Sequence, residues 1–148
     1  MQFHNGGERC SAWHYPGRNG GCVVMAGGFA VTKEPATDLF ARRFNDAGFA
    51  VLAFDYRGLG DSDGHPRLAL RIRDAQKDWH AAIAYARTLA DVDPARIAIW
   101  GFSASGGHIF AVAAREPDLA AAIAQTPLVD APAATPMIMR HYTPLAQH

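Results

Sequence analysis

Ser103 is the side chain whose neighbours best suit it to nucleophilic chemistry, because it lies inside the glycine-rich segment Gly101–Gly107. The segment reads Gly-Phe-Ser-Ala-Ser-Gly-Gly and follows an apolar run, which fits the G-x-S-x-G turn between a strand and a helix. Gly101 takes the first glycine position, whereas Ser105 stands where the second glycine is usual. Serine is small, so we treat Ser105 as a tolerated variant. A serine in such a turn can attack an acyl carbon once an imidazole accepts its proton.

Two other interpretations of this loop stay open. In the first, Ser103 only caps the following helix and the glycines allow close packing of strand and helix. In the second, the loop binds phosphate, but no lysine follows the glycines as the P-loop pattern requires.

A second glycine-containing segment, Asp55–Ser62, also follows an apolar run and reads Asp-Tyr-Arg-Gly-Leu-Gly-Asp-Ser. Gly58 and Gly60 suggest a GxGxxG dinucleotide fingerprint, but position 63 is aspartate and no helix is expected to begin there. A nucleotide-binding Rossmann protein is therefore the weakest of the functional alternatives.

The third segment, Gly27-Gly28-Phe29, lies directly after the apolar run that precedes it. Attack on an acyl group generates a tetrahedral oxyanion, which two backbone N–H groups can stabilise. A loop of this kind is one source of such a donor, and an ordinary glycine turn is the alternative interpretation.

Short apolar runs and amphipathic helices are expected to position these segments. The runs lack alternation of apolar and polar residues, which indicates strands buried on both faces. The predicted class is therefore α/β, with a mainly parallel sheet and helices on both faces. Ligands bind such sheets at the carboxyl ends of the strands, where all three segments fall. The expected strands are Arg9–Tyr15 (an early edge strand), Cys22–Ala26, Phe49–Phe54, Arg96–Trp100 and Leu119–Gln125, and the expected helices are Thr37–Ala47, Ile72–Leu89 and Ala104–Arg115.

Taken in order, the three segments resemble the α/β-hydrolase superfamily, over a stretch from about Phe3 to Asp130. The resemblance is nearest to serine aminopeptidase-like and dienelactone hydrolase-like esterases and peptidases. It implies that Ser103 is the nucleophile and that the N–H groups of Phe29 and Ala104 hold the oxyanion. It also implies that Asp55–Ser62, which matches the family's D-x-R-G-x-G-x-S stretch, is a structural signature near the site. Gly27 departs from the family pattern, where histidine is common.

The remaining members of a catalytic triad follow the serine in this family, in the order acid and then histidine. Only residues 126–148 come after the last expected strand, too few for two further strands with crossover helices. Asp130 is the candidate acid and His141 the candidate base, with His148 as a further histidine. We therefore expect an α/β-hydrolase fold that lacks its C-terminal strands. Residues 1–130 would form a partial core and residues 131–148 the start of a cap or an irregular tail.

Composition limits the other function classes. The chain has 148 residues, which suits one domain, and 14 Lys plus Arg balance 14 Asp plus Glu. A net charge of zero without charged runs argues against nucleic acid or an anionic membrane as partner. No signal peptide or stretch of ~20 apolar residues is present, so a cytoplasmic location is the default expectation. Cys10 and Cys22 lack CxxC spacing and are expected to be buried free thiols rather than a disulfide.

The resulting functional prediction is a serine hydrolase that cleaves an ester, thioester or amide through an acyl-enzyme on Ser103. Its substrate would be a small-molecule or peptide acyl compound, and no metal or organic cofactor is implied. The alternative is a non-catalytic or assembly-dependent half-domain. Such a half-domain would associate with itself or a partner through the sheet edge that the missing strands leave open.

Overall fold

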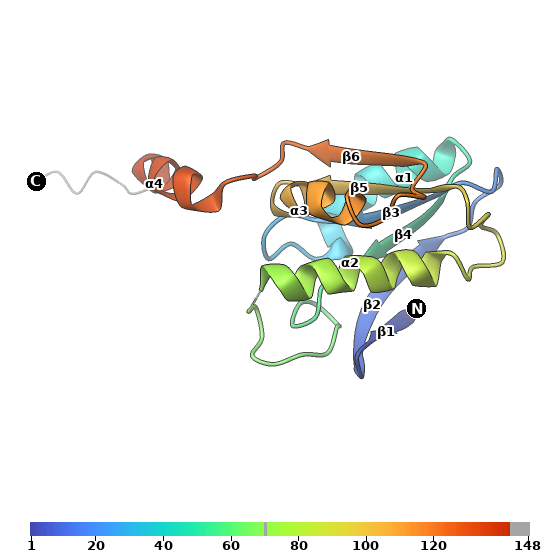
Figure 1. Ribbon diagram of the computed structural model, residues 1–148, viewed down its shortest axis with the longest axis horizontal. Coiled ribbons are helices and arrows are strands. Elements are labelled where there is room, and N and C mark those ends of the chain that lie inside the picture. Colours follow the sequence, from blue (N-terminus) through green and yellow to red (C-terminus); the bar gives the residue numbers. More distant parts are fainter. Residues whose placement is uncertain (70, 143–148) are drawn as a thin grey trace, which may run out of the picture.

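The computed structural model describes residues 1–69 and 71–142 as a six-stranded sheet with helices on both faces (Figure 1). The strand order is β1-β2-β4-β3-β5-β6. The first three of these strands pair antiparallel, and β4, β3, β5 and β6 run parallel. This confirms the predicted α/β class with a mainly parallel sheet. The strands are β1 (Gln2–Asn5), β2 (Glu8–Tyr15), β3 (Cys22–Ala26), β4 (Ala50–Phe54), β5 (Ile97–Phe102) and β6 (Ala121–Gln125), and the helices are η1 (Lys33–Thr37), α1 (Asp38–Asp46), α2 (Ile72–Ala86), α3 (Ala104–Ala113) and α4 (Ala131–Tyr142).

Three elements were not expected from the sequence, namely β1, the short helix η1 and α4. Strand β1 is short, and Phe3 is its only buried residue. Helix α4 lies in the segment predicted to begin a cap or a tail, and Figure 1 shows it extending away from the sheet. Its first turn is stabilised by Asp130, whose side chain accepts a hydrogen bond of 2.9 Å from the N–H of Ala133.

Apolar side chains fill the space on both faces of the sheet. Helices α2 and α3 cover one face and α1 covers the other, in front of and behind the sheet in Figure 1. Successive residues of the parallel strands point to opposite faces, so a strand buried on both sides has to be apolar throughout. The α1 face buries Val23, Met25, Ala41, Val51, Ala53 and Trp100, and the other face buries Val24, Leu52, Phe54, Trp79, Ile83, Ile97, Ile99 and Val112 among others.

The parallel strands bring the three chemical segments to one end of the sheet. Ala26 of β3 is in register with Gly101 of β5, which in turn is in register with Ala124 of β6. The loops after these strands therefore emerge together, at the end where α2 begins and where the chain leaves for α4 (Figure 1).

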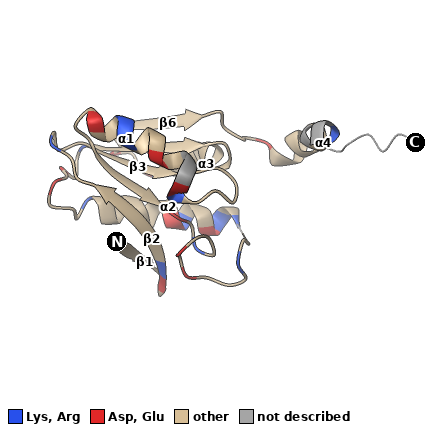
Figure 2. Ribbon diagram, turned by 180° about the vertical axis from the view of Figure 1, so that it is seen from behind, with Lys and Arg blue, Asp and Glu red and all other residues tan. Residues whose placement is uncertain are grey.

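Charged residues are distributed without separation by sign. On α1, for example, Asp38 forms an ion pair of 2.9 Å with Arg42, and blue and red segments lie close together in Figure 2. None of the described helices combines the length and apolar character needed to cross a bilayer.

Candidate active site

Ser103 lies at the sharp junction between β5 and α3, with backbone angles φ 54° and ψ −114°. A positive φ is costly for a residue with a Cβ atom, by about 1–3 kcal/mol, and such strain concentrates at functional sites. The surrounding backbone holds this conformation, because the N–H of Ser103 donates to Gln125 and its carbonyl accepts from Gly107 and Leu128. Its side chain is half-buried, and the hydroxyl makes no hydrogen bond to another described residue.

Gly101, two residues before Ser103, is required because this turn is tight. A Cβ atom at Gly101 would lie 2.6 Å from the carbonyl carbon and oxygen of Ser105, closer than any real side-chain contact. Gly107 is equally constrained, since a Cβ atom there would lie 2.2 Å from the carbonyl oxygen of Leu128. These two glycines let α3 begin directly under the strand end and pack against the loop after β6.

The loop after β3 lies against Ser103. A Cβ atom added at Gly28 would be 3.4 Å from the Cβ atom of Ser103, an ordinary van der Waals contact, so the two residues are neighbours in the fold. The next residue, Phe29, has an exposed side chain. Its N–H and that of Ala104, at the start of α3, form no hydrogen bond within the part of the chain described. Two amide donors near Ser103 in the fold thus have no partner among the described residues.

Ser105 links the two loops through a buried chain of hydrogen bonds. Its hydroxyl donates to the carbonyl oxygen of Gly27 and is also bonded to the hydroxyl of Tyr56. The indole N–H of Trp79, on α2, donates to that same Tyr56 oxygen over 2.8 Å. Burial raises the pKa of Tyr56, which keeps its hydroxyl protonated and able to donate towards Ser105. The serine in the second glycine position therefore ties the turn after β5 to the loop after β3.

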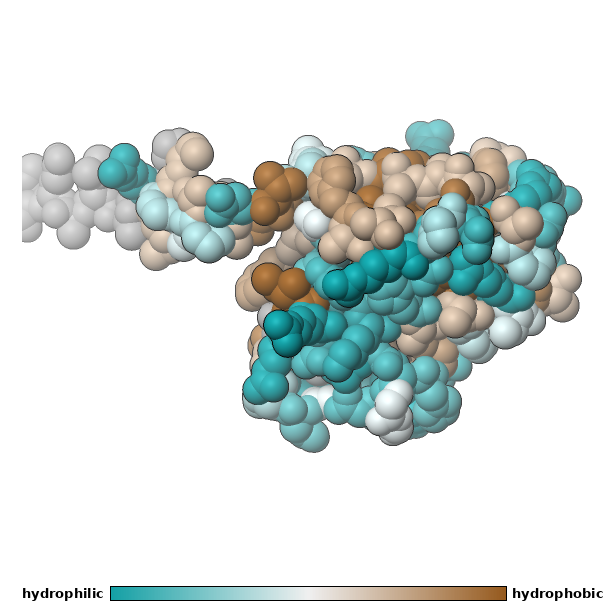
Figure 3. Space-filling view, in the orientation of Figure 1, coloured by the Kyte–Doolittle hydropathy of each residue, from teal (hydrophilic) through white to brown (hydrophobic). Residues whose placement is uncertain are grey.

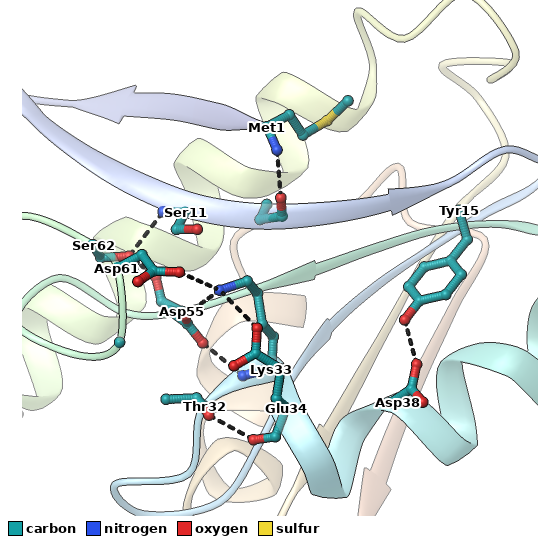
Figure 4. Close-up of polar contacts among 12 residues, drawn as sticks. Met1, Ser11, Tyr15, Thr32, Lys33, Glu34, Asp38, Asp55, Asp61 and Ser62 are labelled. Atoms are coloured by element: carbon teal, nitrogen blue, oxygen red, sulfur yellow. Dashed lines mark hydrogen bonds and ion pairs between the residues drawn. The ribbon is translucent and has the colours of Figure 1, made fainter.

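A buried ion pair between Lys33 and Asp55 fixes the far end of the loop after β3 (Figure 4). The ammonium group of Lys33 lies 2.7 Å from one carboxylate oxygen of Asp55, and the backbone N–H of Lys33 donates to the other. Both side chains are almost completely buried. Burial alone would lower the pKa of Lys33, but the hydrogen bond to Asp55 and nearby carboxylates outweigh it and raise that pKa. Lys33 is therefore a cation in the folded protein.

The Asp55–Ser62 segment is occupied by contacts within the protein. The hydroxyl of Ser62 donates to the carbonyl of Asp55 and accepts from the N–H of Ser11, each over 2.8 Å. Arg57 forms a 2.7 Å ion pair with the fully buried Asp78 of α2. These contacts agree with a structural role for the segment beside the site.

The candidate acid and base are not brought into contact with Ser103 by any interaction among the described residues. Asp130 is exposed and caps α4, as described above. His141 belongs to the last turn of α4, but its side chain lies outside the described part of the structure, as does the whole of His148. The roles predicted for Asp130 and His141 stay predictions.

Three other described histidines pair with carboxylates elsewhere or border the site. His14 and His80 pair with Asp91 and Glu116, at 3.1 Å and 2.7 Å. His108 lies on α3, one turn beyond the Ser103 junction, with its ring 6.2 Å from that of Tyr56. Burial lowers the pKa of His108, so its ring is neutral at pH 7.

The cysteines are buried free thiols, as expected, and burial raises the pKa of both Cys10 and Cys22 to about 12. Neither is a thiolate at neutral pH, so neither competes with Ser103 as a nucleophile. Among residues 1–69 and 71–142, no group of three or more His, Cys, Asp or Glu side chains is arranged to hold a metal ion.

Sequence reasoning missed two contributors to the site. Lys33 gave no local signal, because its partner Asp55 is 22 residues away along the chain. The use of Ser105 was also missed, although its departure from the glycine pattern was visible and marked the position as unusual.

Comparison with known proteins places this geometry in context. The sequence matches the family described as serine aminopeptidase, S33, over residues 17–148. It is similar to the quorum-quenching protein AidA of Acinetobacter baumannii, with 45% identity over 133 residues that make up 88% of this chain and 44% of AidA. The thiohydrolase aneE of Aspergillus aculeatus is 34% identical over 113 residues, or 76% of this chain and 36% of that protein.

The fold is also found among solved structures. The alpha/beta hydrolase GrgF from Penicillium sp. sh18 superimposes with a TM-score of 0.85 and 30% sequence identity, covering 95% of this chain and 51% of GrgF. The chain thus spans about half of the length of these relatives, or less.

Proposed function

Because the chain belongs to the serine aminopeptidase S33 family of α/β hydrolases, we propose that it is a serine hydrolase with Ser103 as its nucleophile. The observation that carries this proposal is the strained backbone of Ser103, φ 54°, at the junction of β5 and α3. A serine that served only as a helix cap would adopt extended backbone angles and bond its hydroxyl to the helix N–H groups, and Ser103 does neither.

In the proposed reaction, the hydroxyl oxygen of Ser103 bonds to the acyl carbon of the substrate and its proton passes to an imidazole base. The N–H groups of Phe29 and Ala104 hold the oxyanion that forms. The bond to the leaving group then breaks, and the leaving group takes up the proton. Water finally cleaves the acyl-enzyme and releases the acid.

We propose an ester, thioester or amide of a small molecule or peptide as substrate. The names of aneE, a thiohydrolase, and of the family, a serine aminopeptidase, support acyl compounds of this range. The reaction as proposed uses only groups of the protein and water.

Asp130 and His141 are the proposed acid and base, because they follow Ser103 in the chain order that this family uses. His141 is the more consequential of the two, since a serine without a base is a poor nucleophile.

A fluorophosphonate probe, which reacts with activated serines, tests the role of Ser103 in this protein. We expect one label per chain, on the peptide that contains Ser103, and none in Ser103→Ala. Thr135→Ala, which removes an exposed hydroxyl on α4, is the control and should label normally. His141→Ala should label ~100-fold or more slowly if His141 is the base. Absence of labelling, or labelling that Ser103→Ala leaves unchanged, would contradict the proposal.

A non-catalytic, assembly-dependent half-domain is the second candidate function. It is favoured by β6, an edge strand that pairs only with β5 among the described residues and whose residues are largely exposed. This alternative predicts that the fluorophosphonate does not label the chain and that chains associate with one another.

A further inference from the structure

A cavity of about 270 Å³ lies beside Ser103, at the carboxyl ends of the strands. Six separate parts of the chain form its walls, namely the loops after β3, β4 and β6, the first turn of α2, the first turns of α3 and the start of α4. Its lining includes Phe29 and Ala104, whose N–H groups are the proposed oxyanion donors, together with Ile72 and Leu128. The cavity therefore borders the proposed reaction centre.

The walls of this cavity carry no charged side chain, and their hydroxyl groups already form hydrogen bonds within the protein. None of the described residues that line it is Asp, Glu, Lys or Arg. Tyr56 and Ser105 contribute hydroxyl groups, but both are already engaged in the hydrogen-bond chain from Trp79 to Gly27. His108 also lines the cavity, and it is uncharged at pH 7. A charged ligand group would find no compensating charge here, so burial in this cavity would be costly for it.

Exposed apolar side chains surround the mouth of the cavity. Phe29 and Ile72 are 67% and 65% exposed, and Val129, next to the lining residue Leu128, is 72% exposed. Figure 3 shows brown, hydrophobic side chains at this end of the molecule, near the start of α2 and where the chain leaves for α4. Apolar residues gathered at a cavity mouth are typical of a ligand site.

The volume limits the size of the ligand. A cavity of ~150 Å³ holds benzene, with its six carbon atoms, so 270 Å³ accommodates roughly ten non-hydrogen atoms at the same packing. This corresponds to a medium-length aliphatic acyl group or a single substituted ring.

We propose that this cavity binds the uncharged, apolar part of the substrate's acyl group, with a preference for groups of roughly ten non-hydrogen atoms. The inference rests on the proposed function for the position of the acyl carbon at Ser103. Such a cavity makes the enzyme selective for medium-length apolar acyl groups over acetyl groups and over charged acyl groups.

Binding of unbranched carboxylic acids, from butyrate to dodecanoate, tests the proposal by isothermal titration calorimetry without any need for turnover. Each added methylene should tighten binding about fourfold, until the cavity is filled at about ten non-hydrogen atoms, after which the affinity levels off. Affinity that does not depend on chain length would overturn the proposal.

A matched pair of variants locates the binding. Ile72→Asn makes the mouth of the cavity polar and should weaken octanoate binding about fivefold or more. Leu39→Asn makes the same kind of change at a residue of α1 that is 70% exposed and does not line the cavity, and it should leave the affinity unchanged. Ala131→Trp, at the start of α4, should shift the preferred length to shorter acids. Equal losses in Ile72→Asn and Leu39→Asn would place the binding elsewhere and contradict the proposal.

The two proposals can fail separately. Ser103→Ala should keep its length-dependent binding, because the apolar walls are intact. If the fluorophosphonate does not label Ser103 but octanoate binding depends on Ile72, the apolar cavity is supported and the hydrolase mechanism is contradicted. If Ser103 is labelled but binding is independent of chain length, the mechanism stands and the cavity proposal is overturned.

Discussion

At the residue scale, Ser105 shows how a departure from a sequence motif acquires a structural use. A glycine at this position would satisfy the tight turn, but it would leave the carbonyl oxygen of Gly27 without the hydroxyl that now donates to it. Ser105 is completely buried, so no solvent replaces that bond. The serine thereby couples the loop that carries Phe29 to the turn that carries Ser103.

We expect Ser105→Ala to lower the free energy of unfolding by about 1–3 kcal/mol, because a buried carbonyl loses its donor. Tyr56→Phe should also destabilise the protein, since Tyr56 is the next member of the same hydrogen-bond chain. The double variant should cost less than the sum of the single ones, with a coupling of about 0.5–3 kcal/mol. Urea denaturation of the four proteins measures this, and strict additivity would show that the two hydroxyls act independently.

At the scale of elements, the loops after β3 and β4 are held together by the ion pair of Lys33 and Asp55. Asp55 is buried at the end of β4, and Gly60 passes so close that a Cβ atom there would lie 2.3 Å from its carboxylate. Lys33 is the side-chain cation that lies closest to this carboxylate, at 2.7 Å. Removal of the cation would leave a buried charge without compensation, which is much more costly than the loss of a surface pair.

Lys33→Met should therefore destabilise the fold by about 3–5 kcal/mol. The matched control is Lys77→Met on α2, which breaks a solvent-exposed pair with Asp74 and should change stability by less than about 1 kcal/mol. Thermal or urea unfolding followed by circular dichroism provides the comparison. A similar effect of the two substitutions would mean that Lys33 contributes no more than a surface lysine.

An element could be predicted when the pattern that indicates it lies within a few consecutive residues of the sequence. Strands β3 and β4 are buried on both faces, so their apolar runs were visible in the sequence. Helix α4 was not expected because four prolines and mixed residues after Thr126 give little helical periodicity, and its cap by Asp130 became clear only from the structure. The turn at Ser103 was predictable from its small neighbours, whereas the contact of Lys33 with Asp55 joins residues far apart in sequence.

At the scale of the whole molecule, the two edges of the sheet differ in how well they are protected from pairing with another chain. The β1 edge consists of four residues and lies beside α2. The β6 edge reads Ala-Ala-Ile-Ala-Gln, without a charge or a proline to discourage pairing. An apolar cavity of about 250 Å³ between α1 and β6, lined in part by Phe44, Phe49 and Ile123, extends the unprotected surface onto one face of the sheet.

We therefore expect the 148-residue chain to self-associate reversibly through β6, with an average mass that rises with concentration in sedimentation experiments. Ile123→Lys places a charge on the exposed part of this strand and should shift the equilibrium towards monomer. Ala84→Lys adds the same charge at an exposed position of α2, on the face of the sheet opposite α1, and should leave the association as it is. Because both variants raise the net charge equally, a difference between them reports the location of the contact rather than general repulsion. A chain that stays monomeric throughout, or a dimer that Ile123→Lys does not weaken, would show that this edge is not a site of association.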